Sequence, residues 1–243
     1  MGLLSSQAVI AAVVVAGGVA VAVSGGSVAD ANALGCPANL AGSLSSTGSA
    51  SQLITVEARA TRSTVASVHL WQRVRSCWLP AGRAWPAWLG LRGLSDHHRE
   101  GDGTTPIGAF PLGPVVYGIA ADPGLRYRYH RLVCGDWWDE DPTSPEYNSF
   151  QHVPCGLRPT FGGSSEALWT ETVAYQHFLV VDYNVRPAVP GRGSGIFVHD
   201  DLGHPTNGCV SLPPADLLSL LRWLRPSARP LIVIGTSREI SAL

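Results

Sequence analysis

Two reactive side chains stand close together near the C-terminal end of the sequence. Cys209 is the last of five cysteines in the 243-residue chain, and His199 lies ten residues before it, at the end of the apolar run GIFVH. A thiol acts as a nucleophile when an imidazole takes its proton and backbone N–H groups stabilise the oxyanion. The pattern predicts Cys209 as nucleophile, His199 as general base and acid, and the amides of Gly208 and Cys209 as oxyanion donors.

The odd number of cysteines bears on which thiol stays free. Disulfides form in an exported chain, and an odd count leaves one cysteine without an intramolecular partner. Cys134 and Cys155 enclose a polar loop rich in tryptophan and proline, which a bridge would stabilise. Cys36 and Cys77 then form the second predicted bridge, and Cys209 is left as the free thiol.

The N-terminus has the composition of an export signal. Residues 8–23 form an uncharged apolar run, followed by small residues at a spacing suited to cleavage. The run is short and interrupted by glycine, which disfavours a membrane-spanning helix. We therefore expect residues 1–33 to be a signal peptide or an N-terminal apolar anchor, residues 34–52 to be a polar linker, and the protein to act outside the cytoplasm.

The overall composition excludes several function classes. The formal net charge is -1, which argues against a general nucleic-acid binder. All 17 basic residues are arginine, so neither a Schiff-base lysine nor a P-loop lysine is present. No motif for a cofactor is found, and we expect none to be used.

The elements that must position the two side chains are mostly strands. Short β-branched or apolar runs are bounded by glycine, proline and asparagine, and the chain contains 27 glycines and 18 prolines. These runs predict strands over 53–58, 63–71, 178–184, 195–199 and 230–235. One helix is predicted over 213–226, with a buried face formed by Leu217, Leu220, Leu221 and Leu224. The fold is thus expected to be mainly β, with Cys209 in the loop between a core strand and a packed helix.

Several motifs together resemble one family. The sequence Thr206-Asn207-Gly208-Cys209 resembles the [Ser/Thr]-x-Gly-Cys motif of the L,D-transpeptidase catalytic domain. The segment GDGTTPIGAF, residues 101–110, resembles the Thr-Pro-x-Gly-x-Phe segment of that family, and the strand carrying His199 precedes the cysteine loop as it does there. The resemblance implies a β-sandwich or barrel with one packed helix after the cysteine loop, over residues 53–237.

The resemblance also assigns roles to residues around the dyad. In this family a backbone carbonyl just after the histidine orients the imidazole, and that carbonyl would belong to Asp200. The expected substrate-binding residues are Thr206, Asn207, His204 and Tyr183. The chain departs from the family pattern in its short His-to-Cys spacing and in having Asn207, Ser211 and Leu212 near the cysteine, which leaves the choice of substrate open.

The resemblance implies an exported enzyme that acts on peptidoglycan stem peptides of a bacterial cell wall. The Cys209 thiolate would attack a stem tetrapeptide and release D-alanine through a thioester, which an amine acceptor would resolve as a 3→3 cross-link. Water as acceptor would instead make the protein an L,D-carboxypeptidase. We expect a monomer, and the apolar N-terminal segment could anchor it to the membrane.

Other interpretations of the same residues remain open. The run HDDLGH offers His199, Asp200, Asp201 and His204 as metal ligands, but zinc sites usually have tighter or repeated spacing, so we expect no metal. In a wall-binding module, Cys209 would be structural and the tryptophans of 77–90 and 135–142 would stack on sugar rings. Peptidoglycan cysteine endopeptidases have the cysteine before the histidine, unlike this chain. The acidic residues of the 135–142 run are expected to form a solvated loop face: Asp136, Asp139, Glu140 and Asp141.

Overall fold

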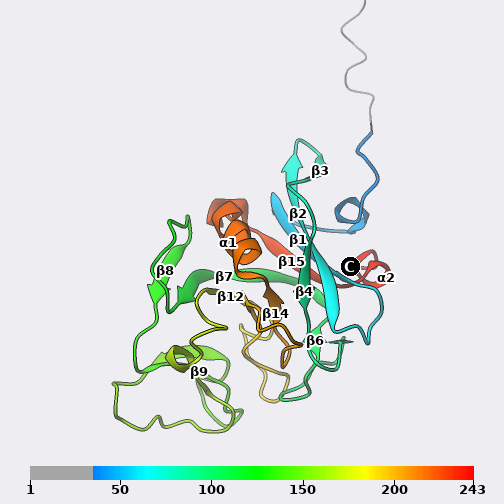
Figure 1. The fold of residues 1–243 in the computed structure, drawn as a ribbon. Helices are drawn as coiled ribbons and strands as arrows, with labels where there is room; N and C mark the ends of the chain where they lie inside the picture. Colours follow the sequence, from blue (N-terminus) through cyan, green and yellow to red (C-terminus); the bar gives the residue numbers. More distant parts are fainter. Residues whose placement is uncertain (1–34) are drawn as a thin grey trace, which may run out of the picture. The chain divides into compact units, whose positions relative to one another are not determined.

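The computed structural model describes residues 35–243 (Figure 1). The signal peptide or anchor expected over residues 1–33 lies outside these described residues. No helix within the described part is both long and apolar enough to cross a membrane. The chain divides into two units, Met1–Gly35 and Cys36–Leu243, and the second carries the fold described below.

The larger unit is built on one ten-stranded sheet that closes on itself. Its strand order is β1-β15-β7-β12-β13-β14-β4-β2-β3, with β8 paired to β7, and the additional β1–β2 pairing closes the path into a barrel-like ring. The mainly β sandwich or barrel predicted from the sequence is confirmed. The bounds are β1 Gln52–Ala58, β2 Val65–Val74, β3 Cys77–Pro80, β4 Trp85–Trp88, β7 Gly108–Gly118, β8 Arg128–Arg131, β12 Phe178–Val181, β13 Phe197–Asp200, β14 Val210–Leu212 and β15 Leu231–Thr236.

The packed helix follows the cysteine loop as predicted. Helix α1 spans Pro214–Trp223, three residues shorter at its C-terminal end than the sequence suggested. Leu224 and Arg225 both have extended backbones, and Pro226 disfavours helical geometry in Arg225, the residue before it, and starts the short 3-10 helix Pro226–Ala228. All four leucines of the predicted face are fully buried, and they pack on the β-branched residues of the main sheet. The final helical turn, α2, spans Ser237–Ile240 and begins with a capping box formed by Thr236 and Glu239.

A smaller sheet lies beside the main one (Figure 1). It has the order β10-β9-β11, with β9 at Asp136–Asp139, β10 at Ser149–His152 and β11 at Glu166–Ala167. The short helix Leu168–Thr170 follows it. The Cys134–Cys155 disulfide, one of the two predicted bridges, joins the chain just before β9 to the chain just after β10. A two-stranded sheet, β5 (Leu94–Ser95) with β6 (Thr105–Pro106), completes the unit.

The prediction of a solvated acidic face in the 135–142 run is wrong for Asp136, Asp139 and Glu140, whereas Asp141 is only half-buried. Asp136 and Asp139 are fully buried, and Glu140 is 8% exposed. The cause is that β9 is the central strand of its sheet and is covered by partners on both edges. Asp136 accepts hydrogen bonds from His130 at 2.8 Å and His152 at 2.7 Å, which lower the pKa of its carboxyl group.

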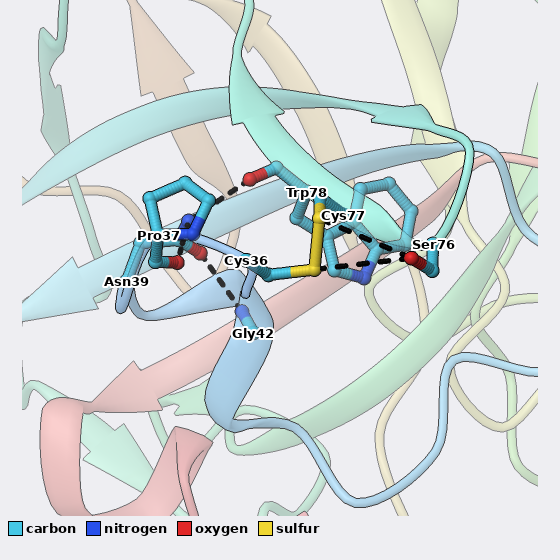
Figure 2. The surroundings of a disulfide bond; sticks show 7 residues. All are labelled: Cys36, Pro37, Asn39, Gly42, Ser76, Cys77 and Trp78. Atoms are coloured by element: carbon cyan, nitrogen blue, oxygen red, sulfur yellow. Dashed lines mark hydrogen bonds between the residues drawn. A yellow bond between two sulfur atoms is a disulfide. The ribbon is translucent and has the colours of Figure 1, made fainter. Parts of the chain in front are cut away.

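The second disulfide ties the N-terminal part of the described chain to the main sheet. Figure 2 shows Cys36 bonded to Cys77 at the start of β3. Next to it, the Asn39 side chain donates to the Trp78 carbonyl at 2.9 Å and precedes the 3-10 helix Ala41–Ser43, whose Ala41 is buried. This disulfide is the second bridge predicted from the sequence.

Candidate active site

The parallel pair β13–β14 brings the predicted nucleophile and base onto neighbouring strands. Val198 is paired with Val210, and His199 with Ser211. Extending this register by one residue sets Cys209 beside Phe197, whose N–H donates to Cys209 Sγ at 3.3 Å. Because side chains alternate along a strand, Cys209 and His199 then share one face of the sheet as diagonal neighbours.

Cys209 is the one free cysteine among the described residues, and it is half-buried. Its thiol donates to the Gly195 carbonyl at 3.2 Å. Burial raises the pKa of the thiol above its ordinary value, with the Glu166 carboxyl group adding to the effect and the Phe197 N–H opposing it. The sulfur is therefore a protonated thiol near neutral pH.

His199 is buried, and its ring is held in one tautomer. Its Nδ1–H donates to the Asp200 carbonyl oxygen at 2.7 Å, the carbonyl that the resemblance assigns to orienting the imidazole. Burial lowers the pKa of His199 to about 4. The imidazole is thus neutral near pH 7, with the Nε2 lone pair available to accept a proton. Within the described residues, no hydrogen bond joins this ring to the Cys209 thiol.

Two cavities meet at the site, one on each side of the dyad. Cys209 lines a cavity of about 420 Å³, and His199 lines a neighbouring cavity of about 250 Å³. Glu166 and Asn207 line both.

The loop before Cys209 is held by local hydrogen bonds. Thr206 Oγ1 donates to the Cys209 carbonyl at 2.7 Å and accepts from the Gly208 N–H at 3.1 Å. Gly208 has a φ of 146°, and a Cβ there would lie 2.9 Å from the Thr104 carbonyl oxygen, so only glycine fits without a shift. Thr105 of β6 also donates to the Cys209 carbonyl, at 3.5 Å, which links the Thr-Pro motif to this loop.

These contacts bear on the predicted oxyanion donors. The Gly208 N–H is occupied by Thr206, whereas no hydrogen bond to the Cys209 N–H is present in residues 35–243. The Cys209 amide is therefore the better placed of the two to bind an oxyanion in this conformation.

The predicted substrate-binding residues separate into two groups. Thr206, Asn207 and His204 line the cavity that contains His199, and the His204 side chain is exposed. Tyr183 lines neither of the two cavities. Its hydroxyl donates to the Arg192 carbonyl at 2.6 Å, so it supports the wall behind the site.

Sequence reasoning missed the acidic groups around the thiol. Glu100, Asp102, Glu140 and Glu166 line the cavity that contains Cys209, together with His98. His98 Nδ1 lies 3.0 Å from both Thr104 Oγ1 and Asp102 Oδ1. The one available signal was the pair of tryptophans in GDWWDEDP, since large aromatic side chains beside carboxylates indicate a partly buried strand.

The fold and sequence agree with one known family. The family model of the L,D-transpeptidase catalytic domain, YkuD, matches residues 72–234, a range that includes both His199 and Cys209. Among solved structures, the chain is similar to the helical cell shape determining protein Pgp2 from Campylobacter jejuni and to a point mutant of it, each at 14% identity and a TM-score of 0.37. Each match covers 79% of this chain and 52% of the other, so the chain spans about half the length of these structures. No curated protein matches it.

Proposed function

Since the chain belongs to the family of L,D-transpeptidase catalytic domains, we propose that Cys209 carries out acyl transfer on peptidoglycan stem peptides. The observation that carries the proposal is the β13–β14 pairing, which sets a free thiol and a neutral, oriented imidazole side by side. Membership of this family supports a peptidoglycan enzyme of the L,D-transpeptidase type. The roles of the individual residues in each reaction step are part of the proposal.

The first half-reaction forms a thioester. His199 Nε2 takes the proton of the Cys209 thiol as Sγ attacks the carbonyl carbon of the third residue of a stem tetrapeptide. The Cys209 N–H stabilises the oxyanion of the tetrahedral intermediate. The bond from this carbon to the nitrogen of D-alanine then breaks, and His199 returns the proton to that nitrogen, so that free D-alanine leaves.

The second half-reaction resolves the thioester. An amine of a neighbouring stem attacks the acyl carbon, the C–S bond breaks, and a proton passes from the amine through His199 to the Cys209 sulfur. The product is a 3→3 cross-link with the thiol regenerated. Water in place of the amine gives a tripeptide with a free carboxylate, which is the L,D-carboxypeptidase reaction.

Mass spectrometry of muropeptides tests this proposal and separates its two forms. Purified protein with both disulfides intact is incubated with disaccharide-tetrapeptide monomers. Loss of D-alanine with dimer formation supports the transpeptidase, and loss of D-alanine with tripeptide alone supports the carboxypeptidase. Glycan binding without any D-alanine release, or release that persists in Cys209→Ser, would overturn both and favour a wall-binding module or another nucleophile.

We also propose that the enzyme works outside the cytoplasm, secreted or associated with the cell wall. Two disulfides and a peptidoglycan-acting domain support this location. Residues 1–33 would serve as the signal peptide or apolar anchor, and the protein would act as a monomer. The mass of the protein recovered from culture medium and from membranes would distinguish cleavage from retention.

A further inference from the structure

The cavity beside the Cys209 thiol has a strongly acidic wall. Four carboxyl groups line its volume of about 420 Å³, contributed by Glu100, Asp102, Glu140 and Glu166. Arg92 is the one arginine or lysine among the lining residues that the structure describes. His98 also lines the cavity, but burial lowers its pKa, so its imidazole is mostly neutral near pH 7. The cavity is large enough for an organic side chain rather than a bare ion.

Glu140 is the most unusual of these groups. It is 8% exposed, and its carboxyl oxygens take part in no hydrogen bond of normal geometry with residues 35–243. The carboxyl group packs against Gly195, where a Cβ would lie 1.8 Å from Glu140 Oε1. The carbonyl of that same glycine accepts the hydrogen bond from Cys209 Sγ. A buried carboxyl group with few hydrogen-bond partners is costly to ionise, and this one packs against the glycine whose carbonyl accepts from the thiol.

The neighbouring carboxyl groups are held in place but keep free acceptor positions. Glu100 Oε2 accepts from the Ser194 hydroxyl at 2.8 Å and from the Tyr147 hydroxyl, and Glu166 Oε2 accepts from the Tyr175 hydroxyl. In the described part of the chain, no hydrogen bond occupies Oε1 of either glutamate. Oxygens of three glutamates therefore remain open around one cavity.

We propose that this cavity binds a primary ammonium group, with Glu140 as the central partner and Glu100 and Glu166 beside it. An ammonium group has three N–H donors and no acceptor, which matches three glutamates with free oxygens. The inference rests on the proposed function and deepens it: the amine that acts as acyl acceptor would enter through this cavity as its ammonium form and pass one proton to a carboxylate of the cavity wall, which leaves the neutral amine that attacks the thioester. Glu140 would then be a specificity-determining residue for an amine acceptor over water.

The electrostatics of the cavity agree with this ligand class. Burial raises the pKa of Glu140 to about 9, with Glu166 and Glu100 adding to the effect and Ser164 opposing it, so the carboxyl group is largely protonated near pH 7 and would ionise when an ammonium group binds beside it. Glu166 also contributes to the raised pKa of the Cys209 thiol. A bound ammonium would offset the negative charge near the thiol, so the thiol would lose its proton more readily when the ammonium is bound.

The test uses thiol reagents that differ only in charge. Methanethiosulfonate reagents of matched length, one carrying an ammonium and one a sulfonate, are reacted with the disulfide-intact protein at pH 8, and modification of Cys209 is followed by intact mass. We expect the ammonium reagent to be favoured by about tenfold or more over the ratio measured for free N-acetylcysteine. We expect Glu140→Gln to lower this preference severalfold, while Glu146→Gln, an exposed glutamate outside the cavity, leaves it unchanged.

Each outcome decides the inference. Equal rates for the two reagents would overturn it, as would a preference that survives in both Glu140→Gln and Glu100→Gln. Should Glu140→Gln fail to fold by thermal unfolding, Glu100→Gln carries the test alone. The readout does not need turnover. A charge preference without D-alanine release would contradict the proposed function and leave the ammonium site standing. D-Alanine release without a charge preference would contradict the ammonium site and leave the proposed function standing.

Discussion

At Cys209 and His199, burial acts in opposite directions on the two partners of one proton transfer. It raises the pKa of the thiol and lowers the pKa of the imidazole to about 4. An ion pair of thiolate and imidazolium is therefore disfavoured between these two groups. In this site the thiolate would form as the attack occurs, with substrate in place.

The role of His199 as base is tested against the neighbouring His204. His199→Ala should lower turnover by roughly 10²–10⁴-fold, the usual contribution of general acid–base catalysis. His204→Ala removes an exposed imidazole that lines the same cavity, and it should cost much less, mainly in KM. Steady-state rates are measured on variants shown to be folded by thermal unfolding. A large loss at His204 with a near-normal His199→Ala would reverse the assignment.

The geometry of the cysteine loop depends on Gly208. Gly208→Ala places a methyl group 2.9 Å from the Thr104 carbonyl oxygen at a φ of 146°, so the loop must shift and carry Cys209 with it. We expect turnover to fall by about tenfold or more, since small misplacements of a nucleophile are costly. Gly203→Ala is the matched control, because it also has a positive φ but has no atom within 4 Å of its Cβ position. Equal losses of turnover in the two variants would contradict this explanation.

Glu140 gives a pH-dependent prediction about stability. Its pKa is raised in the folded state, so between the ordinary glutamate pKa of about 4.3 and the raised value the folded protein binds more protons than the unfolded one. The contribution of Glu140 to the free energy of unfolding therefore falls as pH rises through this range. Glu140→Gln removes the effect and should be more stable than the wild type at pH 8 by several kcal/mol, at about 1.4 kcal/mol for each pH unit above the ordinary pKa, with little difference at pH 4. Urea unfolding at both pH values checks this, and a constant difference would contradict it.

At the scale of elements, the sequence predicted those strands whose own residues are apolar. It did not predict burial that arises when a strand pairs with segments distant in the sequence. The runs 53–58 and 230–235 were apolar in themselves, and they became β1 and β15. The motif around Cys209 and the end of the apolar run at His199 are likewise local features of the sequence. Burial of Asp136 and Glu140 could not be predicted in this way, because it comes from pairing of β9 with β10 and β11 across a disulfide-closed loop.

The small sheet supplies the acidic wall, so its disulfide should matter for function. The bridge closes a sequence separation of 21 residues, for which loop-closure entropy predicts about 3 kcal/mol. Replacing Cys134 and Cys155 together by serine should increase hydrogen exchange over residues 136–167 and lower turnover. The double variant of Cys36 and Cys77 is the control, because that bridge lies on β3, away from both cavities. An equal loss of turnover in the two double variants would show that the small sheet has no special part in the site.

At the scale of the whole described unit, the main sheet closes through β1, which pairs with both β2 and β15. β1 pairs with β2 in antiparallel register and with β15 in parallel register, so the first and last long strands are neighbours. The site lies on the opposite part of the ring, where β13 and β14 are flanked by β12 and β4. Helix α1 covers the core behind this pair through its buried leucines. A nucleophile at the start of β14 and a base near the end of β13 are thus both attached to the packed core.

The central claim, that Cys209 is an acyl-accepting nucleophile, is tested most directly by intact-mass measurement after incubation with a carbapenem. The strained amide of the β-lactam presents a reactive carbonyl to the thiol, and ring opening leaves the whole compound attached as a thioester. We expect one adduct of the full carbapenem mass, located on the peptide that contains Cys209 and absent from Cys209→Ser. No adduct on the folded protein, or an adduct that persists in Cys209→Ser, would contradict the account.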